Sequence, residues 1–166
     1  MDDFLNAVDL EKVESIIVVA FIFQVIIKLL FANTIRVTLK RVRKANQCIM
    51  PNQAWFLAIP LFDIYWNFVV VRRLADSLNN EFYDRKIAVE ENPTAKQGYW
   101  FAGSNLAANF PTPFFVRYLL SVLSLVSFVV YWVKINEYRK LLKTTSASLE
   151  VPPLPADDAK ALENKD

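Results

Sequence analysis

Apolar residues in this chain are gathered into long blocks. The clearest block runs from Phe114 to Val133, a second covers Ile16 to Ala32, and a third covers Ala54 to Ala75. An α-helix rises about 1.5 Å per residue, so such runs approach or match the ~30 Å apolar thickness of a bilayer. In lipid, a lone segment can satisfy its backbone hydrogen bonds only as a helix. The sequence therefore predicts an all-α integral membrane helical bundle.

A fourth hydrophobic segment, residues 98–110, is shorter and more polar than the other three. Pro60 lies inside the second segment, so its helix should begin after this proline or kink there, and it should extend beyond the membrane to about Lys86. We predict an acidic N-terminal segment, a membrane domain of four helices, and a disordered Pro-rich tail. Their ranges are 1–15, 16–143 (helices 16–44, 54–86, 98–110 and 114–143) and 144–166.

The composition excludes several kinds of enzyme chemistry. The chain has no histidine, a single cysteine at Cys48, and glycine only at positions 98 and 103. A histidine-based catalytic pair, a disulfide within the chain and a glycine-rich phosphate loop are therefore all ruled out. We expect a protein that is not an enzyme, takes no cofactor or metal ion, and has no identified small-molecule substrate.

Two polar residues lie near the middle of the second segment. Asp63 and Asn67 are four residues apart and share a helix face. A carboxylate at this depth costs about 2.5–3.5 kcal/mol on insertion scales, so it indicates either function or pairing. Lys28 in the first segment is the nearest candidate counter-charge. Asp63 would indicate an ion pathway if it is wet and unpaired, and a packing role if it meets Lys28.

A basic run follows the first apolar segment, and no acidic residue interrupts it. It consists of Arg36, Lys40, Arg41, Arg43 and Lys44. Such a run is typical of a helix end that meets lipid headgroups, and docking to an acidic partner is the alternative. Nucleic acid is not expected, because the net charge is only +2 and no aromatic residues separate the basic ones.

Small residues suggest where membrane helices pack closely. In the third segment, Gly103 pairs with Ala107 and Ser104 pairs with Ala108 at fourfold spacing, a pattern typical of close helix contact. In the fourth segment one face is expected to form a packing seam with its hydroxyls bonded to carbonyls one turn back. This face holds Arg117, Ser121, Ser124, Phe128 and Tyr131.

The distribution of lysine and arginine bears on orientation. Counted under the positive-inside rule, it favours four spans with both termini in the cytoplasm. The dense run from Lys40 to Lys44 favours the alternative, in which the N-terminus is external and residues 98–110 lie flat on the membrane.

A set of residues between positions 30 and 142 forms a recognisable pattern. It consists of Met50-Pro51, Trp55, Ile59-Pro60-Leu61-Phe62, Trp66-Asn67-Phe68, Ala75-Asp76-Ser77-Leu78, Glu81-Phe82, Arg85, Asn92-Pro93, Gly98, Tyr131-Trp132-Val133-Lys134-Ile135, Tyr138 and Leu141. With this pattern the chain resembles an uncharacterised family of small bacterial four-helix multi-pass membrane proteins. The resemblance implies a four-helix membrane domain in the bacterial inner membrane, without an assigned activity. The family pattern usually has Asn where this chain has Asp63.

Two functions from different classes remain open on the sequence. The first is an accessory or scaffolding subunit of an inner-membrane complex, whose partners are membrane lipids and other membrane-protein subunits. The alternative is a component of an ion, proton or small-solute pathway that uses Asp63. A membrane enzyme is disfavoured because no carboxylates have the spacing of an acid–base pair.

Overall fold

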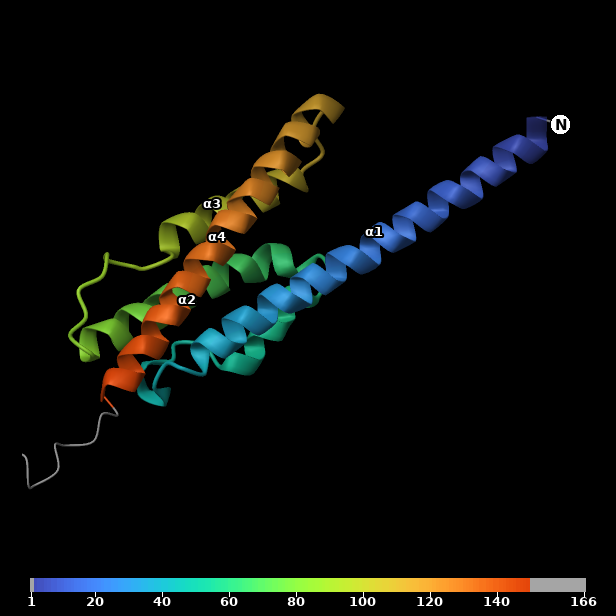
Figure 1. Cartoon of the computed structure of the whole chain (residues 1–166). Helices are drawn as coiled ribbons and strands as arrows, with labels where there is room; N and C mark the ends of the chain where they lie inside the picture. Colours follow the sequence, from blue (N-terminus) through green and yellow to red (C-terminus); the bar gives the residue numbers. More distant parts are fainter. Residues whose placement is uncertain (1, 150–166) are drawn as a thin grey trace, which may run out of the picture.

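Every regular element in the described part of the chain is a helix. The computed structural model describes the backbone of residues 2–149 and the side chains of residues 12–145. Two long helices, α1 (Asp2–Leu39) and α4 (Phe114–Leu149), frame the molecule (Figure 1). Between them in sequence lie the 3₁₀-helices η1 (Lys44–Asn46) and η2 (Pro51–Ala58), then α2 (Phe62–Asp84) and α3 (Ala95–Ala108). The all-α prediction is confirmed.

Two of the helices are long and apolar enough to cross a membrane. They are Lys12–Leu39 of α1 and Phe114–Thr145 of α4, and only 11% and 6% of their apolar windows are buried inside the molecule. The core helix of a soluble protein would be mostly buried. The predicted four spans are not confirmed. α2 is too rich in charged and amide side chains, and the 14 residues of α3 give a length of about 21 Å.

Several predicted boundaries are wrong for local reasons. The acidic residues 2–15 belong to α1, which ends at Leu39 rather than at Lys44. The side-chain amide of Gln47 donates hydrogen bonds to the carbonyls of Leu39 (2.9 Å) and Val42 (2.8 Å), which satisfies carbonyl groups left free at the helix end. α4 continues to Leu149, so residues 144–149 are helical instead of disordered. The rest of the predicted tail lies outside the described residues.

The second hydrophobic segment is divided into two pieces at Pro60. η2 covers its first part, and α2 begins at Phe62, which confirms that the helix starts after the proline. Leu61, between them, has a φ of 66°, and the Phe62 N–H donates to the carbonyl of Pro60 at 2.8 Å. This tight turn reverses the chain, so η2 and α2 form a helical hairpin rather than one continuous helix.

α1 and α4 run in the same direction. Trp132 Nε1 donates to Thr34 Oγ1 at 3.1 Å, and Arg41 Nη1 donates to the carbonyl of Arg139 at 2.9 Å. Both pairs are 98 residues apart in the sequence, whereas the separation would change steadily along an antiparallel pair. The two helices diverge toward their N-terminal ends, and the first half of α1 projects from the rest of the molecule (Figure 1).

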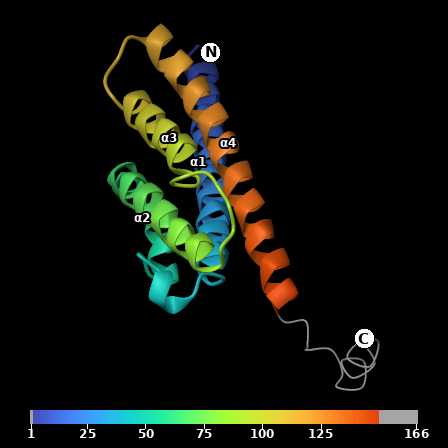
Figure 2. The ribbon, with the colours of Figure 1, turned by 90° about the vertical axis from the view of Figure 1, so that its left-hand side faces the viewer.

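The helical hairpin packs against α1, and α3 packs against α4 and α2. The α2 arm of the hairpin also runs parallel to α1, because Asp63 near its start meets Lys28 and Arg85 at its end meets the Arg41 carbonyl. The η2 arm runs the other way. α3 lies antiparallel beside α4 (Figure 2), with the Phe101 ring 5.3 Å from Phe128 and 6.0 Å from Tyr131 between ring centroids.

The close helix contact occurs at Gly98 rather than at Gly103. A Cβ atom on Gly98 would lie 2.6 Å from Cγ1 of Val71 and 2.9 Å from Cε2 of Tyr131, whereas one on Gly103 would meet nothing within 4 Å. The predicted close helix contact at the Gly103–Ala107 pair is therefore wrong at Gly103. The predicted hydroxyl bonding in α4 is present at Ser121, whose Oγ donates to the Arg117 carbonyl at 2.9 Å.

Candidate functional site

An interhelical cavity of about 480 Å³ lies between α1 and α4, beside the start of α2. Side chains from α1, α3 and α4 make its walls predominantly apolar, including Phe23, Ile27, Phe31, Phe101, Phe128 and Trp132. Phe31 contacts Phe101, Phe128 and Trp132 edge-on, with ring centroids 5.0 to 6.0 Å apart. These rings close the cavity on the side where α1 and α4 approach each other.

Lys28 and Asp63 form an ion pair in the wall of this cavity. Lys28 Nζ lies 2.7 Å from Asp63 Oδ2, and the two side chains are 24% and 6% exposed. Asp63 is in the first turn of α2, where the helix dipole also favours a negative charge. The predicted pairing is confirmed, and it fixes the tip of the helical hairpin to α1. The pair also lines a second cavity of about 150 Å³ on the tip side.

Three carboxamide side chains converge on the interhelical cavity without a protein partner. Gln24 of α1, Asn67 of α2 and Asn105 of α3 all line it, and within the described side chains none of their amide groups makes a hydrogen bond. Asn67 is only 3% exposed and Asn105 is half-buried, whereas Gln24 is exposed. Ser124 adds a hydroxyl group to the same wall. A buried carboxamide without a partner costs free energy, so this group of residues is the most informative feature of the cavity.

We expect the Lys28–Asp63 pair to be coupled energetically. A double-mutant cycle built from Asp63→Asn, Lys28→Met and the combined variant should give a coupling of about 1–3 kcal/mol in the free energy of unfolding, because each single change leaves one polar partner without its counter-charge. Thermal or denaturant unfolding in detergent measures it. Tyr65→Phe, at an exposed position on the same helix, is the control and should show no coupling with Lys28→Met. Additive effects of Asp63→Asn and Lys28→Met would contradict the expectation.

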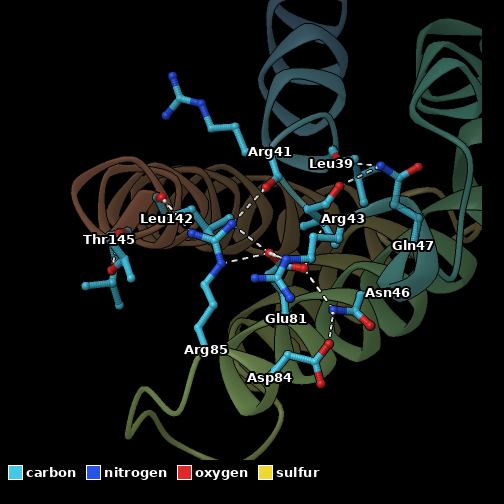
Figure 3. Close-up of polar contacts among 12 residues, drawn as sticks. Leu39, Arg41, Arg43, Asn46, Gln47, Glu81, Asp84, Arg85, Leu142 and Thr145 are labelled. Atoms are coloured by element: carbon cyan, nitrogen blue, oxygen red, sulfur yellow. Dashed lines mark hydrogen bonds and ion pairs between the residues drawn. The ribbon is translucent and has the colours of Figure 1, made fainter. Parts of the chain in front are cut away.

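A second polar site ties the C-terminal end of α1 to α2 and α4, and we call it the polar junction (Figure 3). It is centred on Glu81, which is fully buried, and Arg85, whose side chain is 6% exposed; Arg85 Nη2 lies 2.6 Å from Glu81 Oε1. Asn46 Nδ2 and the Arg43 N–H each donate to Glu81 Oε2 at 2.9 Å. Arg85 donates further hydrogen bonds to the carbonyls of Leu142 (3.2 Å) and Arg41 (3.3 Å).

The environment of Glu81 keeps this carboxylate ionised. Burial alone would raise the pKa of Glu81. The hydrogen bonds from Asn46, the Arg43 N–H and Arg85, together with the charge of Arg85, outweigh burial and hold the pKa below its usual value of 4.5. The carboxylate is therefore a permanent anchor for three separate segments at neutral pH.

The basic run is not the uniform exposed surface that the sequence predicts. Arg36 donates to Asn52 Oδ1 at 3.2 Å and its guanidinium lies 5.8 Å from the ring centre of Trp55. Arg41 and Arg43 bond to Arg139 and Glu81 as described above, although Arg43 remains largely exposed. Lys40 and Lys44 are exposed. The loop that follows Leu39 thus turns part of the basic run inward, and only the lysines and Arg43 remain open to headgroups or a partner.

The structure brings Lys28, Asp63 and Asn67 together, as the sequence predicts, but it separates them from the basic run. Sequence reasoning missed the polar junction. Glu81 and Arg85 stand four apart beside the apolar positions Leu74, Leu78 and Phe82, which is also the spacing of an ordinary exposed pair. It also missed that Gln24 and Asn105 share a cavity with Asn67, because residues so far apart in sequence carry no local signal of contact.

Comparisons with known proteins add no assignment to this geometry. The chain matches no protein-family model, no curated protein and no solved structure. The interhelical cavity and the polar junction are therefore the features from which a function must be argued.

Proposed function

We propose that the chain is an integral protein of the bacterial inner membrane. Its two candidate spans support this, because their apolar side chains are exposed rather than packed into a core of the same chain. Examples are Ile16, Val19, Phe114 and Val133, all more than 60% exposed. Lipid would cover these surfaces at a favourable free energy, whereas water would not. The resemblance to four-helix bacterial membrane proteins supports the same location.

The arrangement of helices favours a different orientation from the one predicted with both termini in the cytoplasm. α1 and α4 are parallel. If both helices cross the membrane, their C-terminal ends lie on the same side and the N-terminal end of α1 lies on the other side. The shorter helix α3, packed against α4, then returns the chain toward the N-terminal end of α4. The helical hairpin enters and leaves on the side of Leu39, with its tip at the depth of Lys28. We propose two full spans, α1 and α4, together with a shorter return through α3 and one re-entrant hairpin.

Charge then assigns the cytoplasmic side. Lys12 and Arg117 lie toward the N-terminal ends of α1 and α4. The opposite end of the molecule is far more basic, and the positive-inside rule places it in the cytoplasm. The basic residues at this end include Lys40, Arg41, Arg43, Lys44, Arg72, Arg73, Arg85, Lys86, Arg139, Lys140 and Lys143.

Cysteine accessibility tests this orientation. Cys48 is partly exposed in the loop after η1, so an impermeant thiol reagent should label it only after the cells are lysed. On a Cys48→Ser background, Lys44→Cys should behave in the same way, and Lys12→Cys should be labelled in intact cells. Labelling of Lys44→Cys before lysis would overturn the proposed orientation.

Within the membrane, the role best supported is that of a non-enzymatic accessory or scaffolding subunit. The observation that carries this proposal is the first half of α1, which projects beyond the other helices (Figure 1). Its side chains Ile16, Ile17 and Val19 are all more than half exposed. A span held away from its own bundle has a complete surface available to a neighbouring membrane helix. The polar junction meanwhile holds the cytoplasmic end rigid.

The alternative role in an ion or proton pathway has less support. Asp63 is paired with Lys28 rather than facing a wet space alone, and a paired carboxylate is a weaker candidate for carrying an ion. We therefore do not propose it.

The residues that carry the family resemblance support a shared architecture. Glu81, Phe82, Tyr131, Ile135 and Tyr138 are all buried at the cytoplasmic end of the bundle. If this core defines the family, members keep the polar junction and vary in the membrane-facing surfaces. We propose membership on this basis.

Photo-crosslinking in native membranes tests the subunit role. A benzophenone amino acid at Ile17, in the projecting half of α1, should give a discrete crosslinked protein band, and the tagged chain should co-purify with the same protein after mild solubilisation. The matched control is the same probe at Val126, an exposed apolar position of α4 that lines neither cavity. A stable monomer without crosslinked protein at Ile17 would refute the proposal.

A further inference from the structure

We propose that the interhelical cavity binds an uncharged, membrane-soluble amphiphile whose head carries carbonyl acceptors, of the isoprenoid quinone type. The inference rests on the membrane location proposed above but is independent of the subunit role. It is carried by three properties of the cavity, namely its walls, its unpartnered amides and its charge balance.

The walls suit a flat apolar head. Binding pockets for small molecules typically have volumes of about 300–1,000 Å³ and apolar linings with a few converging polar groups, and the interhelical cavity fits this description at about 480 Å³. The rings of Phe31, Phe101, Phe128 and Trp132 form a continuous aromatic end wall. Aromatic surfaces of this kind stack well against a planar conjugated ring.

The amide groups in the cavity can donate hydrogen bonds to the head of the ligand. Gln24, Asn67 and Asn105 come from three different helices, yet all line the same cavity and leave their donors without a protein acceptor among the described residues. Lys28 uses one bond on Asp63 and has further N–H donors on the same wall. A head with carbonyl oxygens would accept these hydrogen bonds and remove the cost of leaving the buried amide of Asn67 unpaired in an apolar site.

The charge balance selects an uncharged ligand. The Lys28 and Asp63 charges, 2.7 Å apart, neutralise each other. An anionic head would compete with Asp63 for Lys28, and a cationic head would compete with Lys28 for Asp63. Either would break a pair that also holds the hairpin tip, so a neutral head is favoured.

The shape of the bundle provides a route from the lipid. α1 and α4 diverge toward their N-terminal ends (Figure 1). The lining of the cavity continues in that direction through Ala20, Phe23 and Ser121. A head seated near Asn67 can therefore leave its isoprenoid tail between the two long helices. The tail would cover apolar side chains that the protein itself leaves exposed, such as Phe23 and Leu125.

Fluorescence quenching of the purified full-length chain in lipid nanodiscs tests the proposal. The probe is a 2-methyl-1,4-naphthoquinone with a short isoprenoid tail. We expect saturable quenching that is lost in Trp132→Phe, because Trp132 lines the cavity. Asn67→Leu and Asn105→Leu should each raise the Kd about 3- to 10-fold, the effect of losing one hydrogen bond.

Asn80→Leu is the matched control, because it makes the same substitution at an exposed carboxamide of α2 that does not line the cavity. It should change the Kd less than twofold. Size-exclusion profiles and thermal unfolding check that each variant is folded, and Asn105→Leu serves if Asn67→Leu does not fold. Absence of saturable quenching, or quenching that neither asparagine variant weakens, would overturn the proposal. The proposal would also be overturned if a photo-crosslinker placed at Ser124 reacted with a helix of another protein and this crosslink prevented the naphthoquinone from quenching.

Discussion

Replacing Glu81 with alanine is expected to lower the free energy of unfolding by about 3–5 kcal/mol, the usual cost of removing one member of a buried ion pair. The variant would leave the Arg85 guanidinium, whose side chain is 6% exposed, without its carboxylate. It would also leave Asn46 Nδ2 and the Arg43 N–H without an acceptor that each now reaches at 2.9 Å. Thermal unfolding of the purified protein in detergent measures the loss.

An exposed ion pair in α4 provides the control. Lys134 and Glu137 lie 3.1 Å apart, but their side chains are 31% and 62% exposed, so Glu137→Ala should cost no more than about 1 kcal/mol. The double variant Glu81→Met/Arg85→Met should recover much of the loss, because apolar side chains can replace a buried pair at little cost. A Glu81→Ala protein as stable as Glu137→Ala would contradict the role of the polar junction.

Glu81 also gives stability a defined dependence on pH. The pKa of Glu81 in the folded chain is held below the ordinary value of 4.5, so its contribution is fully present above that value. As the pH falls below 4.5 and through the folded pKa, the carboxylate is protonated and the contribution is lost. Between pH 7 and pH 3, the melting temperature of the wild type should therefore fall more than that of Glu81→Gln. Parallel decreases in both proteins would exclude Glu81 as a source of the acid sensitivity.

Local sequence patterns predict the individual helices well and their arrangement poorly. The apolar runs at 16–32 and 114–133 correspond to α1 and α4, and Pro60 correctly marks the start of α2. These features depend on residues close together in the chain. The pairing of Lys28 with Asp63 was also predictable, because few charges lie within apolar segments and they carry opposite signs.

Helix direction, in contrast, depends on contacts between distant residues. Nothing in the sequence near Thr34 indicates that it meets Trp132, and this contact shows that α1 and α4 are parallel. The count of basic residues assumed that each hydrophobic segment crosses the membrane once. The η2–α2 hairpin conflicts with that assumption, because the turn at Leu61 reverses the chain within the second segment.

The two glycines of the chain test the packing of α3 as a matched pair. Gly98→Ala should lower the free energy of unfolding by about 1–3 kcal/mol, the typical cost of overfilling a packed interior. The new Cβ would lie 2.6 and 2.7 Å from the two methyl groups of Val71 and 2.9 Å from Tyr131. Val71 is completely buried and β-branched, so it has little freedom to move aside.

Gly103→Ala is the control on the same helix and should have the opposite effect. Its Cβ would meet nothing within 4 Å, and alanine favours a helix by up to about 1 kcal/mol over glycine. Unfolding of both variants in the same detergent gives the comparison. Val71→Ala should destabilise the wild type, because it opens a cavity at a completely buried position, but it should destabilise the Gly98→Ala protein less or stabilise it, because it removes the two methyl groups that collide. If Gly98→Ala is as stable as Gly103→Ala, then α3 does not pack against α2 at Gly98, and the antiparallel placement of α3 beside α4 would need revision.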